Sequence, residues 1–518
     1  MSEVAVETEA PPMQGAALLI AGLVLALANF MAVLDTTIVN VSVSTIAGGL
    51  AVSPNEGTWA ITSYSVAEAI TVPLTGWLAQ RFGTVRTFVV CIVMFGLFSA
   101  LCGLAPSLGV LVAFRVLQGL SGGPLMPLSQ ALLMNIFPPD RRNQALGLWS
   151  MTTVTAPIIG PILGGWINDN IAWPWIFYIN IPVAGFCAFT AFRNLSGRET
   201  KTRRAPIDVV GMILLVIWVG SLEIMLDKGN ELDWFQSRTV VTLTIVALIG
   251  FVSFVIWELT SENPAVDLRL FTKPGFVFAA VVMSLTFGAF FGSVVLIPLW
   301  LQSSQSYTAS WAGLVTGANG VFAVVMSPVV AQLVRKIDPR ALISFGVATL
   351  GLVMVWRTTF VSGMSAGQLI LPHLAMGFAM PFFFIPLQAL AMSSVAPQQT
   401  ASAAGLINFV RTVSGAFAVN LIVTEWDHAA QRSHDTLSGR LGDTTAATNA
   451  MSQAAGGAAS TLGAPTSGLS QIDGLLQNQS VMLATNHVFG ILALAFAAGA
   501  LVVWLAPRPQ RVQMGSGH

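Results

Sequence analysis

The sequence contains few charged residues. Only 9% of its 518 residues are Asp, Glu, Lys or Arg, against roughly 25% in soluble proteins. The formal net charge is zero, which gives no reason to expect nucleic acid as a partner. The three cysteines, Cys91, Cys102 and Cys187, lie in apolar runs, so we expect neither a disulfide framework nor a metal site. The composition therefore predicts an integral membrane protein without a cofactor.

Motifs for enzymatic chemistry are also missing. The chain has no Gly-Lys-Ser/Thr phosphate-binding loop and no nucleophile with a plausible base. His428, His434 and His487 lie in or beside one long polar segment, where we expect them to be solvated rather than to bind metal. These absences predict a protein that is not an enzyme and that draws its energy from an ion gradient.

Long hydrophobic runs are what the chain has in abundance. A hydrocarbon core about 30 Å thick requires ~20 apolar residues per helix. The sequence predicts an all-α membrane protein with fourteen spans, arranged 6+2+6, near residues 15–35, 57–79, 86–105, 107–136, 142–168, 174–193, 207–226, 238–258, 275–302, 310–335, 341–360, 366–394, 400–425 and 482–506.

The basic residues indicate the orientation of these spans. With a cytoplasmic N-terminus, sixteen of the 23 Lys and Arg residues fall in inner loops or the C-terminal tail, and two, Arg115 and Arg411, fall within spans. The remaining five lie in outer loops or at outer helix ends: Lys228, Arg238, Arg357, Arg432 and Arg440. Because cytoplasmic loops are enriched in Lys and Arg, this distribution predicts that both termini are cytoplasmic.

The pattern divides the chain into two bundles joined by an inserted pair of helices. The predicted parts are a cytoplasmic tail (1–14), a six-helix bundle (15–193), a basic cytoplasmic linker (194–206), two inserted spans (207–258), a second bundle (275–506) that contains a periplasmic loop (426–480), and a C-terminal tail (507–518). Residues 76–88 and 331–342 each place a basic cluster and a turn after a span. Such a repeat is typical of transporters built from duplicated six-helix halves.

Ionisable side chains within spans are costly and mark an ion or substrate path by default. Asp35, Glu68 and Arg115 lie in the first, second and fourth predicted spans, and Glu223 lies near the outer end of the seventh. The negative charges of the two inner acids, Asp35 and Glu68, balance the positive charges of the two inner bases, Arg115 and Arg411. Protonation of an acid and binding of an organic cation would each leave surplus positive charge, so the two should compete. Competition of this kind is the physical basis of antiport.

Structural explanations of the same residues remain open. Asp35 and Arg115 could be an ion pair that only fixes helix packing, and Arg115 could instead hydrogen-bond backbone carbonyls. Arg411 and Asn408, on one predicted span, could line a substrate cavity, or Arg411 could clamp two helices.

The stretch "TAPIIGPILGGW" at 155–166 combines helix breakers with a hydrophobic setting. Ala156, Gly160 and Gly164 recur every four residues and form a strip of small residues that permits close helix approach. Pro157 and Pro161 remove backbone hydrogen bonds and can bend the helix. We interpret the stretch, with Gly165, as a bent and close-packed seal between the two halves. The alternative is a kinked packing helix with no further role.

Four stretches resemble motifs of the major facilitator superfamily, in its fourteen-helix drug/proton antiporter branch of the EmrB type. "LDTTIVNV" from Leu34 is similar to the helix 1 motif, and "RVLQGLSGG" from Arg115 resembles the helix 4 motif, whose arginine is implicated in proton coupling. The stretch from Ala156 to Gly165 resembles the helix 5 antiporter motif. "GWLAQRFGTVR" looks like the gating loop 2–3 motif and contains Gly76, Gln80, Arg81, Gly83 and Arg86.

The resemblance implies proton-driven export of hydrophobic or cationic small molecules across the bacterial inner membrane. It also implies a periplasmic adaptor of the EmrA kind and an outer-membrane channel of the TolC kind, with segment 426–480 as a docking surface or lid. The chain departs from the motifs at Gln80, where an acid is usual, at Ser44, where proline is common, and at Ala156, where glycine begins the motif.

Two other functions compete with this prediction. The same fold could import or export a specific metabolite or siderophore with protons, against which the helix 5 stretch argues. A membrane scaffold or sensor that transports nothing is a third possibility, but such a protein gains nothing from acids that cost a few kcal/mol each within the membrane.

Overall fold

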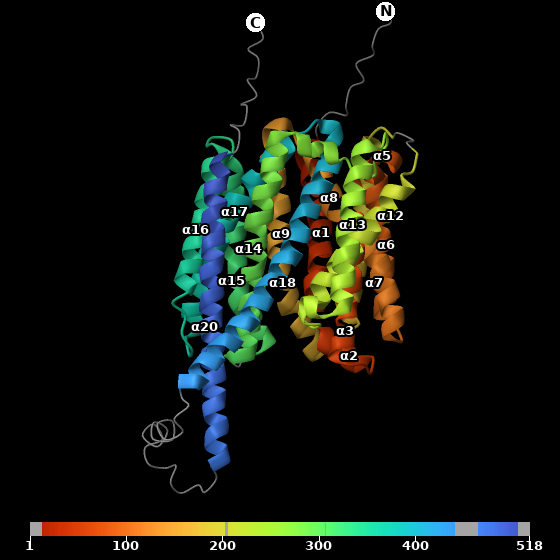
Figure 1. The fold of residues 1–518 in the computed structure, drawn as a ribbon. Helices are drawn as coiled ribbons and strands as arrows, with labels where there is room; N and C mark the ends of the chain where they lie inside the picture. Colours follow the sequence, from red (N-terminus) through yellow and green to blue (C-terminus); the bar gives the residue numbers. More distant parts are fainter. Residues whose placement is uncertain (1–12, 203–205, 306, 441–464, 506–518) are drawn as a thin grey trace, which may run out of the picture.

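The computed structural model describes residues 13–202, 206–305, 307–440 and 465–505. Within these ranges every regular element is a helix (Figure 1). The predicted spans correspond to α1 (Gly15–Asn40), α4 (Trp59–Thr71) with α5 (Thr75–Phe82), α6 (Thr84–Gly103), α7 (Leu108–Gly122) with α8 (Leu125–Ile136), α9 (Arg142–Asn170), α10 (Trp175–Tyr178) with α11 (Asn180–Leu195), α12 (Val209–Gly229), α13 (Arg238–Thr260), α14 (Pro274–Ser304), α15 (Ala309–Leu333), α16 (Pro339–Arg357), α17 (Ala366–Ser393), α18 (Thr400–Arg440) and α20 (Pro465–Val502). The all-α prediction is confirmed.

The second predicted span is divided into two helices. Among the described residues, thirteen segments are each long and apolar enough to cross a membrane, and the stretch 57–79 is not one of them. It forms α4 and α5, of 13 and 8 residues, separated at Val72–Leu74. Pro73 explains the break, because proline has no N–H to donate and clashes with the preceding turn. Neither helix alone reaches the ~20 residues of a span, but together they do.

The helices form two bundles with the same packing pattern. In the first, α1 packs against α9 and α11, α4 against α7, and α6 against α7 and α11. In the second, α14 packs against α18 and α20, α15 against α17, and α16 against α17 and α20. The inserted helices α12 and α13 pack against each other, and α12 also contacts α4 and α18. Contacts of α15 with α9, and of α18 with α5 and α8, join the bundles.

Two glycines, one in each bundle, show which positions of the two bundles correspond. Gly119 and Gly377 are each the twelfth residue of their helices, α7 and α17. A Cβ on Gly119 would lie 2.5 Å from the backbone oxygen of Tyr64 on α4, and a Cβ on Gly377 would collide with the backbone oxygen of Asn319 on α15. The same close approach therefore occurs in both halves, and α7 and α17 can be compared residue by residue.

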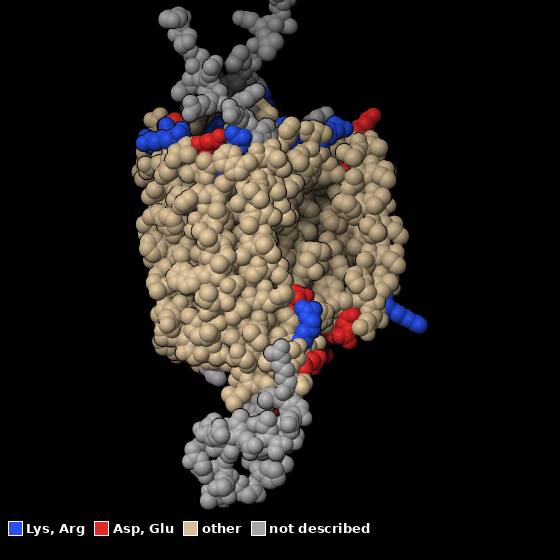
Figure 2. Space-filling view, turned by 60° about the vertical axis from the view of Figure 1, so that its left-hand side comes forward, with Lys and Arg blue, Asp and Glu red and all other residues tan. Residues whose placement is uncertain are grey.

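On the face shown in Figure 2, the exposed charged side chains gather toward the two ends of the molecule and leave an uncharged band between them. The described chain begins and ends on the same face (Figure 1). This arrangement is that of a protein that spans a membrane many times. Which face is cytoplasmic remains a prediction from the basic residues.

The last two long helices extend past the membrane thickness. α18 has 41 residues and α20 has 38, or roughly 60 Å each at 1.5 Å per residue. The predicted loop 426–480 is helical up to Arg440 and again from Pro465, and Trp426 on α18 donates a 2.9 Å hydrogen bond to Thr485 on α20. The middle of that loop, 441–464, lies outside the described residues, as do 1–12 and 506–518 of the predicted tails.

Candidate functional site

A buried ion pair lies at the centre of the first bundle. Asp35 on α1 and Arg115 on α7 are 0% and 1% exposed, and the Arg115 Nη1 donates to the Asp35 Oδ2 at 2.7 Å. Arg115 also donates through Nε to the backbone oxygen of Ala60 at 2.8 Å. The structure therefore contains both arrangements that were open for Arg115, an ion pair and a bond to a backbone carbonyl.

Two amide side chains complete the hydrogen bonding of this pair. Gln118 donates to Asp35 at 3.1 Å and accepts from Arg115 at 2.9 Å. Asn180, the first residue of α11, donates to the same Asp35 oxygen at 2.7 Å. Asp35 is thus held by three donors from α7 and α11. Sequence reasoning missed both amides; the one available signal for Gln118 was its position one turn after Arg115, on the same helix face.

Aromatic rings enclose the guanidinium of Arg115. Its central carbon lies 4.2 Å from the ring centre of Tyr64 and 5.6 Å from that of Phe177. A cation over an aromatic face is stabilised by the ring quadrupole, and more strongly when water is excluded. The cluster of Asp35, Arg115, Gln118 and Asn180 is consequently neutral, buried and fully hydrogen-bonded at the carboxylate.

A second basic residue lies between the bundles. Arg411 on α18 is 4% exposed, contacts the sulfur of Met126, and lies 5.9 Å from the Trp149 ring and 5.1 Å from the Phe287 ring. Glu68 on α4 is half-buried and interacts with Arg411 through space, without a direct ion pair among the described residues. Glu68 and Arg411 therefore interact electrostatically from opposite halves of the molecule.

Asn408 belongs to a chain of amides one turn away. It donates to Gln130 on α8 at 2.9 Å, and Gln130 donates to Gln388 on α17 at 3.0 Å. The Asn408 Oδ1 and the Gln388 Nε2 are buried without a partner in the described part of the protein. Free amide groups of this kind are available to hydrogen-bond a polar substrate atom.

Glu223 lies apart from the Asp35 cluster. It is on α12, 7% exposed, and its Oε1 has no hydrogen-bond partner among the residues described. It interacts electrostatically with Glu68 and with Asp227, which accepts a 2.7 Å hydrogen bond from Thr62 on α4. Glu68 thus interacts with Glu223 and Arg411, and it also interacts through space with Asp35 and Arg115, so the hydrogen-bonded cluster is not isolated from the other buried charges.

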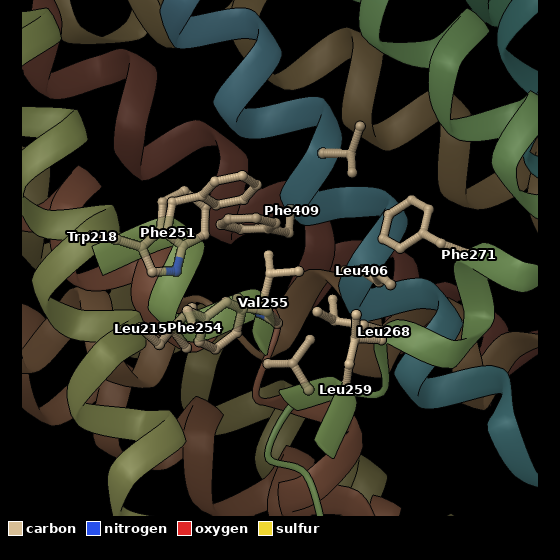
Figure 3. A pocket seen from close by; sticks show the side chains of 13 residues that line it. Leu215, Trp218, Phe251, Phe254, Val255, Leu259, Leu268, Phe271, Leu406 and Phe409 are labelled. Carbon is tan, nitrogen blue, oxygen red and sulfur yellow. The ribbon is translucent and has the colours of Figure 1, made fainter. Parts of the chain in front are cut away.

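An apolar groove borders the same stretch of α18. It has a volume of about 340 Å³ and is lined from three directions: by the inserted pair α12 and α13, by the connection after α13, and by α18 (Figure 3). Trp218 packs edge-on against Phe409 with their ring centres 5.7 Å apart. Phe409 lies between Asn408 and Arg411 in sequence, so one short segment of α18 contributes to the groove and to the polar interior.

The helix 5 stretch is placed differently from our interpretation. α9 is one continuous helix with Pro157 and Pro161 inside it. A Cβ on Gly160 would come within 3.2 Å of the Ile38 backbone nitrogen, and one on Gly164 within 2.9 Å of the Ile38 backbone oxygen. The small-residue strip with Ala156 thus packs against α1 of its own bundle. Our interpretation of this face as a seal between the two halves was wrong.

The proline side of α9 meets the other bundle instead. A Cβ on Gly313 of α15 would lie 3.8 Å from the Pro161 Cβ and 3.3 Å from Ile162. The face was misassigned because sequence spacing shows which residues share a helix face but not which neighbour that face contacts.

The loop 2–3 residues lie at the face where the described chain begins and ends. A Cβ on Gly76 would come within 2.6 Å of the Ser402 Cα, and Gln80 donates to Ser402 at 3.4 Å, so α5 packs closely against the first turn of α18. Gly83 has φ +96°, in the left-handed region that favours glycine. Arg81 lies near the rings of Trp77 and Phe82, at 5.6 and 5.8 Å.

An acid from the linker takes a role in this loop. Glu199 accepts hydrogen bonds from the backbone N–H groups of Val85 and Arg86, at 2.9 and 2.8 Å, and lies 3.9 Å from the Arg86 side chain. A carboxylate at a helix N-terminus satisfies free N–H groups and complements the helix dipole. Linker 194–206 thereby ties itself to the start of α6.

The duplicated bundles, the buried charges and the amides between the halves define a membrane transporter. A family model described as "Major Facilitator Superfamily" matches residues 25–419. Because the match covers most of the chain, the protein belongs to the major facilitator superfamily, a family of transporters rather than enzymes.

Relatives within this superfamily are similar over nearly the whole length. The chain is 42% identical to the "Multidrug export protein EmrB" of Escherichia coli K12, with 98% of both chains covered. It is also 42% identical to the "Fatty acid resistance protein FarB" of Neisseria gonorrhoeae, with 98% and 99% covered. Among solved structures, the human organic anion transporter MFSD10 shares the fold, with a TM-score of 0.62 at 14% identity and 95% and 100% covered. The resemblance to EmrB-type exporters is therefore confirmed.

Proposed function

We propose that this protein exports hydrophobic small molecules of several kinds, among them drugs, in exchange for protons. The observation that carries the proposal is the similarity to EmrB, whose name states multidrug export, at 42% identity over 98% of the chain. FarB, at equal identity, is named for fatty acid resistance, which adds amphipathic carboxylates to the candidate substrates. The predicted cationic substrates remain candidates as well. Transport of a single metabolite or siderophore is the alternative.

The buried charges support a division of labour in proton coupling. Asp35 is held by Arg115, Gln118 and Asn180, so a proton reaches it only when this cluster rearranges. The Glu68 carboxylate has no hydrogen bond among the described residues and interacts through space with Arg411 of the other half. We therefore assign proton binding to Glu68 during exchange, with Glu223 as an acid that interacts with it, and assign to Asp35 and Arg115 the coupling of that event to helix movement.

The apolar groove supports a route for hydrophobic substrates. Its lining includes Leu259 and Leu406, which lie at the ends of α13 and α18 nearest to the face where the described chain begins and ends. Leu268 and Phe271, in the connection after α13, line it as well (Figure 3). The apolar part of a substrate can occupy such a groove from the bilayer, while its polar part reaches Asn408 and Arg411 past Phe409. Movement of Phe409 would open that path.

We propose the bacterial inner membrane as the location, with both termini in the cytoplasm. Lys and Arg are more frequent at the face where the described chain begins and ends, which supports this orientation. The division into bundles 15–193 and 275–506, with linker 194–206 and inserted helices 207–258, is part of the same proposal. α18 and α20 then project into the periplasm, where an EmrA-like adaptor and a TolC-like channel would receive the substrate.

The coupling proposal can be tested in everted membrane vesicles. With an imposed proton gradient, wild-type vesicles should accumulate a lipophilic fluorescent dye, and vesicles with Glu68→Gln or Asp35→Asn should not. Asp140→Asn, a change at an acid whose side chain is 60% exposed, is the matched control and should transport normally. Equal accumulation by Glu68→Gln and wild type would disprove the role of Glu68, and dye loss on acidifying the lumen would indicate import.

The partner proposal needs a separate measurement. Deleting residues 440–470 should leave vesicle transport intact but abolish drug resistance in whole cells, because export through the outer membrane requires the adaptor. Resistance that survives the deletion would remove segment 426–480 as the docking surface.

A further inference from the structure

The second bundle contains a buried cation that has no counter-ion among the residues that the structure describes. Arg357, the last residue of α16, is 0% exposed and lies 5.6 Å from the ring centre of Phe489 on α20. Its Nε, Nη1 and Nη2 have no hydrogen-bond partner in the part of the chain that the structure describes. A buried charge without hydrogen-bond partners is costly, and one aromatic contact compensates only part of that cost.

A buried histidine lies near this cation. His373 on α17 is 1% exposed, its Nδ1 lies 2.7 Å from the backbone oxygen of Leu369, and it interacts through space with Arg357. Since a carbonyl oxygen only accepts, the Nδ1 carries the hydrogen. A further unpartnered donor, the Nε1 of buried Trp300, belongs to the same aromatic group, because Trp300 stacks on Phe360 at 5.9 Å and Phe360 packs against Phe489 at 6.0 Å.

No acid among the described residues pairs with Arg357; Glu425 on α18, the acid beside His487 of α20, pairs with His487 and Arg432 instead. α14, α15, α16 and α17 contain no Asp or Glu at all. In the first bundle the arginine of α7 is neutralised by Asp35 on α1, but α14, which packs in the second bundle as α1 does in the first, offers no carboxylate. The described residues therefore leave the Arg357 charge without a counter-ion.

We propose that the second bundle binds a monovalent anion at Arg357, at the end of the bundle opposite the termini. The guanidinium offers N–H donors in a planar fork that suits a carboxylate, and a halide can accept from the same donors. Two sources share this chemistry: chloride from the medium and the carboxylate of an amphipathic solute. The inference concerns the second bundle alone and does not depend on the direction of transport or on proton coupling.

The test uses the full-length protein purified in detergent. The midpoint of thermal unfolding is followed by tryptophan fluorescence. The reference salt is sodium gluconate, because its large hydrated anion is excluded from an apolar bundle. At constant ionic strength it is then replaced by sodium chloride or, in part, by sodium decanoate. Decanol, which has the same chain without the charge, controls for apolar binding. The midpoint of the wild type should rise saturably, by about 3 °C or more.

Arg357→Met should lose this rise and, in gluconate alone, should unfold at a higher temperature than the wild type, because the uncompensated charge is gone. Arg238→Met, at the exposed start of α13, should respond to the anions as the wild type does. If Arg357→Met does not fold, Arg357→Lys should still respond, but at about tenfold higher anion concentration.

The outcomes separate the two sources. A rise with chloride alone identifies a halide site, and a rise with decanoate but with neither chloride nor decanol identifies a carboxylate site. An unfolding midpoint that depends equally on these anions in wild type and Arg357→Met, or on neither anion in the wild type, overturns the proposal.

Discussion

Arg115 and His373 occupy the same position in two bundles that pack alike, yet their surroundings differ. Each is the eighth residue of its helix, seven residues after the start of α7 or α17. Arg115 is bonded to Asp35, Gln118 and a backbone oxygen. His373 has a cation, Arg357, as its charged neighbour. One half of the molecule thus neutralises its buried charge internally, and the other does not.

The difference shows that duplicated packing does not require duplicated charge. Close helix contacts, such as those at Gly119 and Gly377, are set by shape and are kept in both halves. Buried charges contribute little to stability on average, since desolvation offsets most of the attraction. Each half can therefore carry its own set of buried charges while the helix packing stays the same.

The largest effect should follow from giving the first bundle an unpaired buried charge, as the second bundle has at Arg357. Arg115→Met leaves the Asp35 charge buried with amide donors alone, and we expect a loss of about 3–5 kcal/mol in the free energy of unfolding, together with loss of transport. Unfolding in mixed micelles titrated with a denaturing detergent measures the stability change.

The matched control is the double variant Asp35→Asn/Arg115→Met, which removes both charges. It should recover most of the stability while remaining inactive in dye transport. Equal destabilisation of the single and double variants would contradict an ion pair whose halves depend on each other.

A smaller and symmetric effect is expected at the two close approaches. Gly119→Ala and Gly377→Ala should each cost about 1–3 kcal/mol, because the added methyl group meets backbone atoms that cannot move aside easily. The same detergent titration measures both. Gly109→Ala and Gly367→Ala, at the second residues of α7 and α17 with open space around each Cβ, should be close to neutral. Strongly unequal costs in the two halves would argue against the shared register.

The smallest effect concerns the first turns of α6 and α16, the third membrane spans of the two halves. In the second bundle Asp338 accepts from the Arg340 backbone N–H at 2.9 Å, and in the first bundle Glu199 of the linker serves α6 in the same way. Glu199→Gln and Asp338→Asn should each lower stability by about 0.5–1 kcal/mol, an effect that salt reduces. Glu262→Gln, at an exposed acid, should cost nothing. An effect of Glu199→Gln that does not respond to salt would contradict the helix-dipole origin.

Much of the architecture could be predicted from the sequence because the membrane simplifies the problem. Hydrophobic length identifies spans, and the cost of charge in lipid singles out Asp35, Glu68, Arg115 and Arg411. The division of the second span at Pro73 is a local effect of one residue, and its apolar sequence conceals it from a search by hydropathy.

Contacts between helices could not be predicted in the same way. They depend on how each helix is rotated about its axis and on which neighbour it meets. Asn180 and Gln118 are ordinary polar residues until α11 and α7 bring them to Asp35. Arg357 ends a hydrophobic run, so the sequence places it with the outer boundary residues, whereas the aromatic side chains from α20 and the turn after α16 bury it completely.

The length of α18 gives it the character of a lever. Asn408, Phe409 and Arg411 lie near one end of this single helix, and Arg440 lies at the other, roughly 45 Å away at 1.5 Å per residue. If α18 tilts by about 10° when a substrate or proton changes its inner contacts, the far end swings by roughly 8 Å. A protein docked on that end would sense each turn of the transport cycle as a mechanical displacement.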